Sequence, residues 1–543
     1  MPFQELNLPR YRRVLAVVLC ASSAGAWAAQ PELRSEPVWR YTAPSGACEI
    51  ACYSANSRLL FVTSGEGVDV VDPRSGMRVD VIKRPEGYHP TSVANSLGRL
   101  AVTWAADDKN LPGQIGVIIV AGGEKPRGAR SFPAGYLPDM VAFSPDGRYL
   151  LAANEGEPTD DYAVDPEGSI TVIDTAAGLD EASVRQATFT EFNPQREELR
   201  GCGVRIFGPS RRHDDGQATV AEDLEPEYIA VAADSRRAWV SLQENNAIAE
   251  IDLPNCRVTA IHALGAKDFR RSSTFQLASG SRLWTSGLDA SDADGGARIR
   301  HWPVFGLLQP DGIAVISHQG QDYLLTANEG DPRRYPGFDE PCCAGELVAR
   351  GNALDQRLKA RLLLADAQLG RLEVSTAMGD TDGDGDLDNL YSFGTRSFSI
   401  WRMEGHRPPK LVFDSGHDFE RITAQQAPDR YNADSTSAGV PDECSPKRGP
   451  EPESVAVAKV GASVVAAIGL EKTGGAMLYD VTDPVAPVFL KYLPALDSDG
   501  VLDCAPEGVL MIAAESSPTG QTLLVLCHEA SGTVTAYSLE WRP

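Results

Sequence analysis

The segment from residue 379 to residue 388 carries an aspartate at every second position. It reads Gly379-Asp380-Thr381-Asp382-Gly383-Asp384-Gly385-Asp386-Leu387-Asp388, so its acids are Asp380, Asp382, Asp384, Asp386 and Asp388. Alternating carboxylates with a glycine at the turn let a short loop wrap oxygen atoms around one ion, as in the calcium loop D-x-D-x-D-G. Tyr391 holds the twelfth position, where a helix-loop-helix calcium site has Glu. We therefore expect a calcium-binding loop without the helical frame. A merely solvated acidic turn is the alternative.

Other acids recur at two points of a repeated pattern, before one apolar run and after the next. The first group is Glu49, Asp139, Glu227, Asp311, Glu453 and Glu507, and the second is Glu66, Glu155, Glu244, Glu329, Glu471 and Glu529. If these positions meet around one axis, so many carboxylates cannot all stay ionised without protonation, hydrogen bonds from backbone amides or a bound cation. Hard oxygen ligands favour calcium or magnesium. The alternative is that many of these acids only cap neighbouring strands.

The familiar catalytic motifs are missing from the sequence. It contains no G-x-S-x-G, no H-E-x-x-H, no P-loop and no G-x-G-x-x-G. A calcium-rich site could still hold a phosphate and lower the pKa of a bound water, as a metal-dependent phosphoesterase requires. Arg396 is the candidate anion-binding residue for that chemistry. An ordinary ion pair between Arg396 and the acidic loop is the alternative.

The elements that must position these acids form a unit that recurs seven times. Each unit is an acidic or Pro-acidic step, a short apolar strand, a turn and a second apolar strand, and the units start at residues 49, 90, 138, 226, 310, 452 and 506. A third strand usually follows and often ends in an acid, as in residues 170–174. Such a unit is typical of a propeller blade.

We therefore expect an all-β fold, a seven-bladed β-propeller of the YVTN or WD40-like kind with long loop insertions. In that fold the first strands start at one end of the central channel, and the link after each second strand returns to the same end. Both groups of acids should then line the channel mouth. Residues 39–41, Trp-Arg-Tyr, could supply the outer strand of the last blade and close the ring. A β-sandwich with coincidental repeats is the alternative.

The spacing of the units predicts long inserts. A plain blade needs roughly 40 to 50 residues, and three intervals are much longer. They place inserts near residues 175–222, 253–305 and 330–448. Inserts of this kind are usually where loops acquire function, although decoration or oligomer contacts are the alternative.

Residues 1–28 have the features of an export signal. Three arginines precede an apolar run over residues 14–20, and small residues follow, ending in Ala26-Trp27-Ala28. We expect cleavage after Ala28 and one propeller over residues 29–543, soluble and either periplasmic or extracellular. No later segment is apolar enough to span a membrane. Nine cysteines remain after residue 28, so at least one thiol stays unpaired, and the sequence leaves the pairing open.

The charge of the chain restricts its partners. The sequence has 75 acidic against 50 basic residues, a formal net charge of −25. This excess argues against nucleic acid and anionic membrane surfaces as partners. A divalent cation is the natural partner, beside an unspecified small molecule, phosphate or surface ligand.

Several of these motifs together resemble the choice-of-anchor I family, which is similar to the mesenchyme-specific cell-surface glycoproteins of biomineralising animals. The matching stretches are residues 137–147, 153–158, 224–228, 243–246, 328–331, 379–388, 396–401 and 449–453. The resemblance implies a secreted or surface-held β-propeller, and related modules occur in proteins labelled as alkaline phosphatases or phytase-like esterases. It implies no activity that can be transferred residue by residue.

Two hypotheses about function follow. The first is an exported, calcium-binding β-propeller that acts as an extracytoplasmic binding or scaffold protein, based on the repeat, the acidic loop and the missing catalytic motifs. The second is a calcium-dependent phosphoesterase, alkaline phosphatase-like or phytase-like, that uses the acidic channel mouth.

Overall fold

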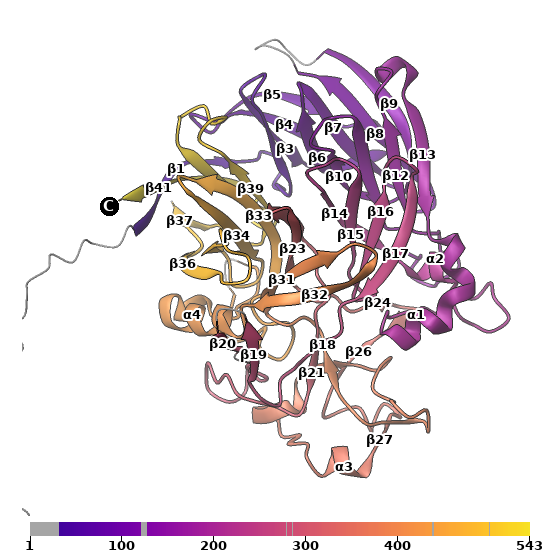
Figure 1. The fold of residues 1–543 in the computed structure, drawn as a ribbon. Helices are drawn as coiled ribbons and strands as arrows, with labels where there is room; N and C mark the ends of the chain where they lie inside the picture. Colours follow the sequence, from indigo (N-terminus) through magenta and orange to yellow (C-terminus); the bar gives the residue numbers. More distant parts are fainter. Residues whose placement is uncertain are drawn as a thin grey trace, which may run out of the picture.

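The computed structural model describes residues 32–120, 127–277, 280–284, 286–436, 439–498 and 500–542. The expected export signal lies outside these ranges. Within them the chain is all-β with few helices, which confirms the all-β part of the expected fold (Figure 1). The nine cysteines that were expected to remain are free thiols.

The described residues contain seven separate four-stranded antiparallel sheets. The first four sheets are β2 (Ala51–Ser54), β3 (Leu59–Ser64), β4 (Gly67–Asp72) and β5 (Met77–Lys83); β6 (Tyr88–Ser96), β7 (Arg99–Ala106), β8 (Pro112–Ile119) and β9 (Arg127–Tyr136); β10 (Pro138–Phe143), β11 (Tyr149–Asn154), β12 (Ser169–Asp174) and β13 (Ser183–Thr188); and β14 (Pro226–Val231), β15 (Arg237–Leu242), β16 (Ala247–Asp252) and β17 (Arg257–Ala263).

In the other three sheets the strands also follow one another in chain order, except that the last sheet includes β1. They are β22 (Ile313–His318), β23 (Gln321–Asn328), β31 (Ser397–Glu404) and β32 (Arg407–Asp414); β33 (Pro452–Val460), β34 (Ser463–Leu470), β35 (Ala476–Asp480) and β36 (Val488–Leu493); and β39 (Pro506–Ile512), β40 (Thr522–His528), β41 (Thr533–Arg542) and β1 (Glu32–Thr42). The last sheet thus takes its fourth strand from the start of the described chain.

The sheets pack face to face, which explains the apolar runs in the sequence. All six residues of β11 and all seven of β40 are buried, because both faces of these second strands meet neighbouring sheets. The core clusters accordingly join successive sheets; Leu151 of β11 and Val240 of β15 share one of them. The fourth strand β13 reads Ser-Val-Arg-Gln-Ala-Thr and buries a single residue. The core therefore lies between the sheets, and the fourth strands face solvent.

The first strands of the sheets contact one another in chain order. β2 contacts β6, β6 contacts β10, β10 contacts β14, β14 contacts β22, β22 contacts β33, and β33 contacts β39. The last first strand, β39, also contacts β2. The residues at the start of these strands are thereby gathered at one place.

The strand expected around residues 39–41 is β1, and it pairs with β41 as predicted. Trp39 lies opposite Ala536 and Tyr41 lies opposite Val534. Figure 1 shows the indigo β1 beside the yellow β41, although they come from opposite ends of the chain. The Trp39 indole is buried and donates a hydrogen bond to the carbonyl of Pro73, 2.7 Å away.

The ranges expected as inserts contain regular strands of the large sheets. β13 and β17 lie inside the ranges 175–222 and 253–305, and β31 and β32 lie inside 330–448. The irregular parts are therefore shorter, and the third one is split in two by β31 and β32. Polar fourth strands such as β13 lack the apolar run by which the other strands were recognised.

The inserts build small elements of their own. They hold α1 (Arg196–Cys202), α2 (Val220–Asp223), α3 (Gln356–Lys359), α4 (Asp418–Gln426) and a five-stranded sheet of β18 (Ala266–Asp268), β21 (Phe305–Leu307), β30 (Tyr391–Ser392), β28 (Glu373–Ser375) and β26 (Pro341–Cys343). Two-stranded pairs in the inserts are β19 (Ser273–Leu277) with β20 (Gly280–Trp284), β24 (Arg334–Tyr335) with β25 (Phe338–Asp339), and β27 (Ala353–Leu354) with β29 (Asp386–Leu387). A further pair, β37 (Asp497–Ser498) with β38 (Val501–Leu502), lies outside the inserts, between β36 and β39. In Figure 1, α3 and β27 project below the large sheets.

We expect Trp39→Ala to lower the free energy of unfolding by about 3–5 kcal/mol, since it removes a buried indole from the core beneath β1. Val38 on the same strand is 39% exposed, so Val38→Ala should change it by no more than about 0.5 kcal/mol. Urea unfolding followed by far-UV circular dichroism measures both. Equal effects of the two substitutions would contradict the packing of β1 onto β41.

Candidate functional site

A cavity of about 190 Å³ lies where the first strands meet. Nine of the predicted acids line it: Glu49, Asp139, Glu155, Glu227, Asp311, Glu329, Glu453, Glu507 and Glu529. Six of them belong to the first predicted group and three to the second. The other lining residues are Ile50, Thr91, Ser92, Met140, Tyr228 and Gln243. We call this space the central cavity.

An irregularity at the start of the first strands places several of these acids. β10 pairs with β11 at Pro138, skips two residues and resumes pairing at Val141. β14 and β33 show the same shift after Pro226 and Pro452. A bulge re-aims the side chains of the residues it contains. The acid that follows each proline therefore leaves the ladder and faces the central cavity.

Burial and mutual repulsion raise the pKa values of the cavity acids. Burial, followed by the charge of Glu529, raises the pKa of Glu49 to about 7. Burial, followed by the charges of Asp311 and Glu49, raises the pKa of Asp139 to about 8. Glu155 and Glu227 have pKa values far above the ordinary range for the same two reasons. Near neutral pH the cavity therefore favours bound protons or a bound cation over free carboxylates.

One side of the central cavity carries its own counter-charges. Arg448 lies 3.9 Å from Glu329 and 2.8 Å from Glu451, and Lys472 lies 2.6 Å from Glu471. Gln243 also donates a 2.6 Å hydrogen bond to Glu329. Burial alone would raise the pKa of Glu451, but Arg448 and Lys472 more than offset it and lower that pKa. This side is an ion-pair network in which two basic side chains offset part of the charge of the acids.

Three predicted acids lie outside the cavity lining. Glu244 is buried, and burial raises its pKa to about 7. Glu471 belongs to the ion-pair network just described, and burial followed by repulsion from Glu451 raises its pKa to about 7 as well. Glu66 pairs at 2.7 Å with Arg78, away from the cavity.

Arg396 does not fit the anion-binding role expected of it. Its side chain is buried and lies 2.5 Å from Glu420 in a buried ion pair. Its guanidinium also donates to the carbonyls of Asp289 and Ser445, each 2.6 Å away. The guanidinium is thus occupied by the protein. Its partner is Glu420 of α4 and not the acidic loop.

The aspartate loop folds back on itself. The backbone amides of Gly383 and Gly385, both with positive φ, donate to the two carboxylate oxygens of Asp380 at 2.7 and 3.0 Å. Thr381 donates from its amide and its hydroxyl to Asp388, and these hydrogen bonds lower the pKa of Asp388. Oxygens of Asp380, Asp382 and Asp388 all lie within 4.8 Å of one another. The structure thus brings three of the five predicted ligands together, while Asp384 and Asp386 stand outside this group.

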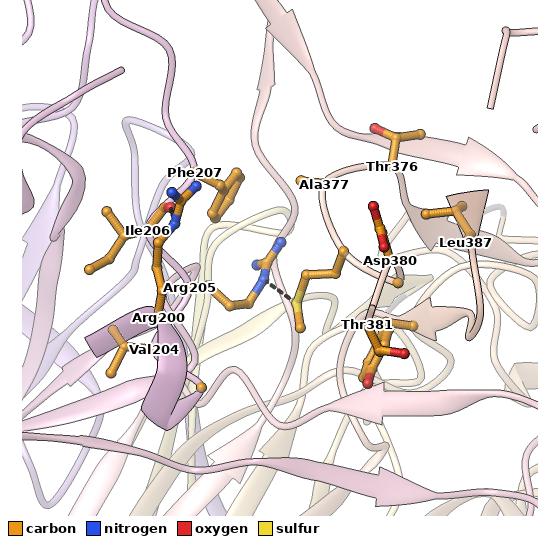
Figure 2. Close-up of a pocket in the computed structure, with 14 residues that line it drawn as sticks. Arg200, Val204, Arg205, Ile206, Phe207, Thr376, Ala377, Asp380, Thr381 and Leu387 are labelled. Atoms are coloured by element: carbon orange, nitrogen blue, oxygen red, sulfur yellow. Dashed lines mark hydrogen bonds between the residues drawn. The ribbon is translucent and has the colours of Figure 1, made fainter. Parts of the chain in front are cut away.

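A pocket of about 360 Å³ opens beside this loop. Figure 2 shows Arg200, Val204 and Ile206 on one side, and Thr376, Asp380, Thr381 and Leu387 on the other. Gly203, Arg205, Phe207, Ala377, Met378, Gly379 and Tyr391 complete the lining. We call this space the insert pocket, since its walls come from two of the inserts.

Buried ion pairs hold the walls of the insert pocket together. Arg205 pairs with Glu340, and both side chains are buried. The Arg205 Nε also donates to the sulfur of Met378 at 3.2 Å, the dashed line in Figure 2. The guanidinium of Arg205 lies 4.2 Å from the ring centre of Phe207. Because breaking a buried pair leaves an uncompensated charge, these contacts fix the two inserts relative to each other.

Sequence reasoning missed the Arg205–Glu340 pair and Glu451. Arg205 and Glu340 are isolated charges in irregular segments, and no local pattern links positions so far apart. Glu451 had a signal that could have been used. A Glu-Pro-Glu triplet occurs at residues 225–227 and again at 451–453, so a third acidic position recurs just before the strand.

The family model for the choice-of-anchor I domain matches residues 49–484 of this sequence. The chain belongs to the choice-of-anchor I family. The match covers β2 to β35, and therefore most of the acids that line the central cavity and the whole aspartate loop. The family resemblance drawn from the sequence motifs is thus confirmed.

Two curated proteins are similar to this choice-of-anchor I chain. Gigasin-3a of Magallana gigas is 32% identical over 188 residues, which cover 32% of this chain and 65% of Gigasin-3a. The mesenchyme-specific cell surface glycoprotein of Strongylocentrotus purpuratus is 26% identical over 386 residues, covering 66% of this chain and 46% of the glycoprotein. The chain thus spans less than two thirds of each relative.

Solved structures resemble the chain only distantly. Kuenenia stuttgartiensis hydrazine synthase is 13% identical with a TM-score of 0.44, over 91% of this chain and 96% of the other. The β-propeller domain of Cps50 (Swd1) from Myceliophteria thermophila is 10% identical with a TM-score of 0.42, over 93% and 99%. Among the described residues, no helix combines the length and apolarity needed to cross a membrane.

We expect the protein in the presence of a chelator to lose stability as the pH rises from 5 to 8. Glu49, Glu244 and Glu471 have folded-state pKa values of about 7 and Asp139 of about 8, all above their ordinary values. The folded state therefore binds these protons more tightly than the unfolded state, and that stabilisation disappears as the protons leave. The thermal midpoint measured at several pH values in EDTA should fall across this window, and less steeply in Asp139→Asn. A midpoint that rises steadily from pH 5 to 8 would contradict the electrostatics of the cavity.

Proposed function

We propose that this choice-of-anchor I protein is an exported, calcium-binding, seven-bladed β-propeller that acts as a binding or scaffold protein outside the cytoplasm. The seven four-stranded sheets and the succession of contacts from β2 to β39 and back to β2 support the blade number. Pairing of β1 with β41 supports closure of the ring, because the last blade is completed by the first strand.

Calcium is the cation that the aspartate loop fits best. Asp380, Asp382 and Asp388 offer three oxygens close enough to share one ion. Calcium takes six to eight oxygen ligands at about 2.3–2.6 Å and accepts irregular geometry, so backbone carbonyls, waters or a ligand would complete its shell. Exposed Asp382 keeps one side of the loop open to solvent.

The observation that carries the binding function is the position of the insert pocket against this loop. Asp380 and Thr381 belong to both the loop and the pocket wall. A ligand in the pocket could give an oxygen to the calcium ion and pack its apolar face against Phe207 and Tyr391. This arrangement suits a small molecule, or the end of a larger chain, that carries both hydroxyl or carboxylate oxygens and apolar surface.

The geometry favours binding over phosphoester hydrolysis. Arg396, the residue that would have held the phosphate, is occupied by Glu420 and backbone carbonyls. The lining of the central cavity includes no Arg, Lys or His among the described residues. A phosphate in the cavity would therefore be lined by carboxylates, and its binding there would depend on a metal ion.

An extracytoplasmic location is part of the proposal. The sequence of residues 1–28 supports export, and the choice-of-anchor domain fits a surface-held or exported protein. One relative is named as a cell surface glycoprotein, which supports the same location for this chain.

We expect the double variant Asp380→Asn, Asp382→Asn to lose one calcium equivalent in isothermal titration calorimetry, because it removes two of the three converging carboxylates. The matched control is Asp384→Asn, which removes one charge from the same loop but lies outside the converging group. That control should keep the stoichiometry. A double variant with unchanged stoichiometry, or a control that loses the site equally, would remove the loop from the proposal.

A further inference from the structure

The central cavity is asymmetric in charge. Of its nine lining acids, only Glu329 forms an ion pair with a basic side chain within the described part of the chain, and that partner is Arg448. The acids on the side of Asp139 have no such partner among the described residues. Three of these, Asp139, Glu155 and Glu227, have oxygens within 4.8 Å of one another.

We propose that Asp139, Glu155 and Glu227 bind a second divalent cation, of the hard, oxygen-preferring class that includes calcium, inside the central cavity. This site is separate from the aspartate loop and does not depend on it. Asp139 stands at the start of β10 and Glu155 directly after β11, whereas Glu227 stands at the start of β14. The ion would therefore bridge two successive sheets.

A buried carboxylate oxygen without a hydrogen bond supports a cation in this cavity. Glu453 is 5% exposed and lines the cavity, yet its Oε2 atom makes no hydrogen bond. A buried carboxylate oxygen without a donor is costly, and in native structures such a group usually faces a water or an ion. Among the described residues, no basic side chain lines the cavity, so none can donate the missing hydrogen bond to Glu453.

The spacing of the three carboxylates suits a hard divalent ion. Two oxygens bound to one calcium ion at about 2.3–2.6 Å are at most about 5 Å apart, and the three oxygens meet this limit. The volume of about 190 Å³ leaves room for waters that complete the shell. The contrasting triad of Glu329, Glu451 and Glu471 has similar spacing, but Arg448 and Lys472 already offset part of its charge.

The test is calcium titration of the metal-free full chain by isothermal titration calorimetry, with the loop variant Asp380→Asn, Asp382→Asn as background. We expect two equivalents in the unmodified chain, one in the loop variant, and none when Glu155→Gln is added to it. Glu529→Gln is the matched control, since it removes one charge from the same cavity but lies outside the triad. In the loop background this control should keep its one equivalent.

A second readout separates loss of the site from loss of the fold. Glu155→Gln removes repulsion in the metal-free protein, so its thermal midpoint without calcium should rise, while the midpoint increase caused by calcium should shrink. Asp139→Asn should behave in the same way. A loop variant that binds no calcium, or a Glu155→Gln chain that keeps its calcium-induced increase, would overturn this inference. A loop variant that still binds both equivalents would instead overturn the loop site and leave this one standing.

Discussion

Carboxylates can be buried together only if their charge is removed or balanced, and this constraint governs the centre of the molecule. The repeated strands supply acids but hardly any bases to the central cavity. The bases that do approach it, Arg448 and Lys472, come from the segment before β33 and the link after β34. Arg333, which follows β23, likewise forms an ion pair with the buried Glu225, 2.9 Å away. These counter-charges come from the links beside the strands, and they reach only part of the cavity wall.

The inserts form a second unit of organisation with its own core. Phe269, Trp302, Leu347 and Leu387 belong to one buried cluster that joins two of the inserts. Leu387 lies inside the aspartate loop, so the loop is anchored in this core at its apolar residue while its acids point outward. The Arg205 and Glu340 pair joins a third insert to it. The insert pocket is therefore a consequence of insert packing and is independent of the repeat.

Features that depend on a short repeated pattern in the sequence, such as the starts of the first strands, could be predicted. The starts of β10, β14, β33 and β39 coincide with the predicted units, because a proline, an acid and an apolar run recur in each. Fourth strands such as β13 and β32 were not predicted, because exposure to solvent weakens the run of apolar residues by which the other strands were recognised. The pairing of Arg396 with Glu420 of α4 was not predicted, because no local pattern links two residues that are 24 positions apart. Convergence of acids could be predicted from the repeat, whereas their neutralisation could not.

The two proposed cation sites differ in what an ion would do there. The loop site is exposed and belongs to a pocket wall, so its ion could exchange with solvent and share its shell with a ligand. The cavity site lies between β10 and β14, so its ion would act on the contact between sheets. A binding surface gains from an open coordination shell, whereas a ring of sheets gains from a closed one that offsets repulsion. If both proposed sites bind cations, the same chemistry of clustered carboxylates would serve recognition where it is exposed and stability where it is enclosed.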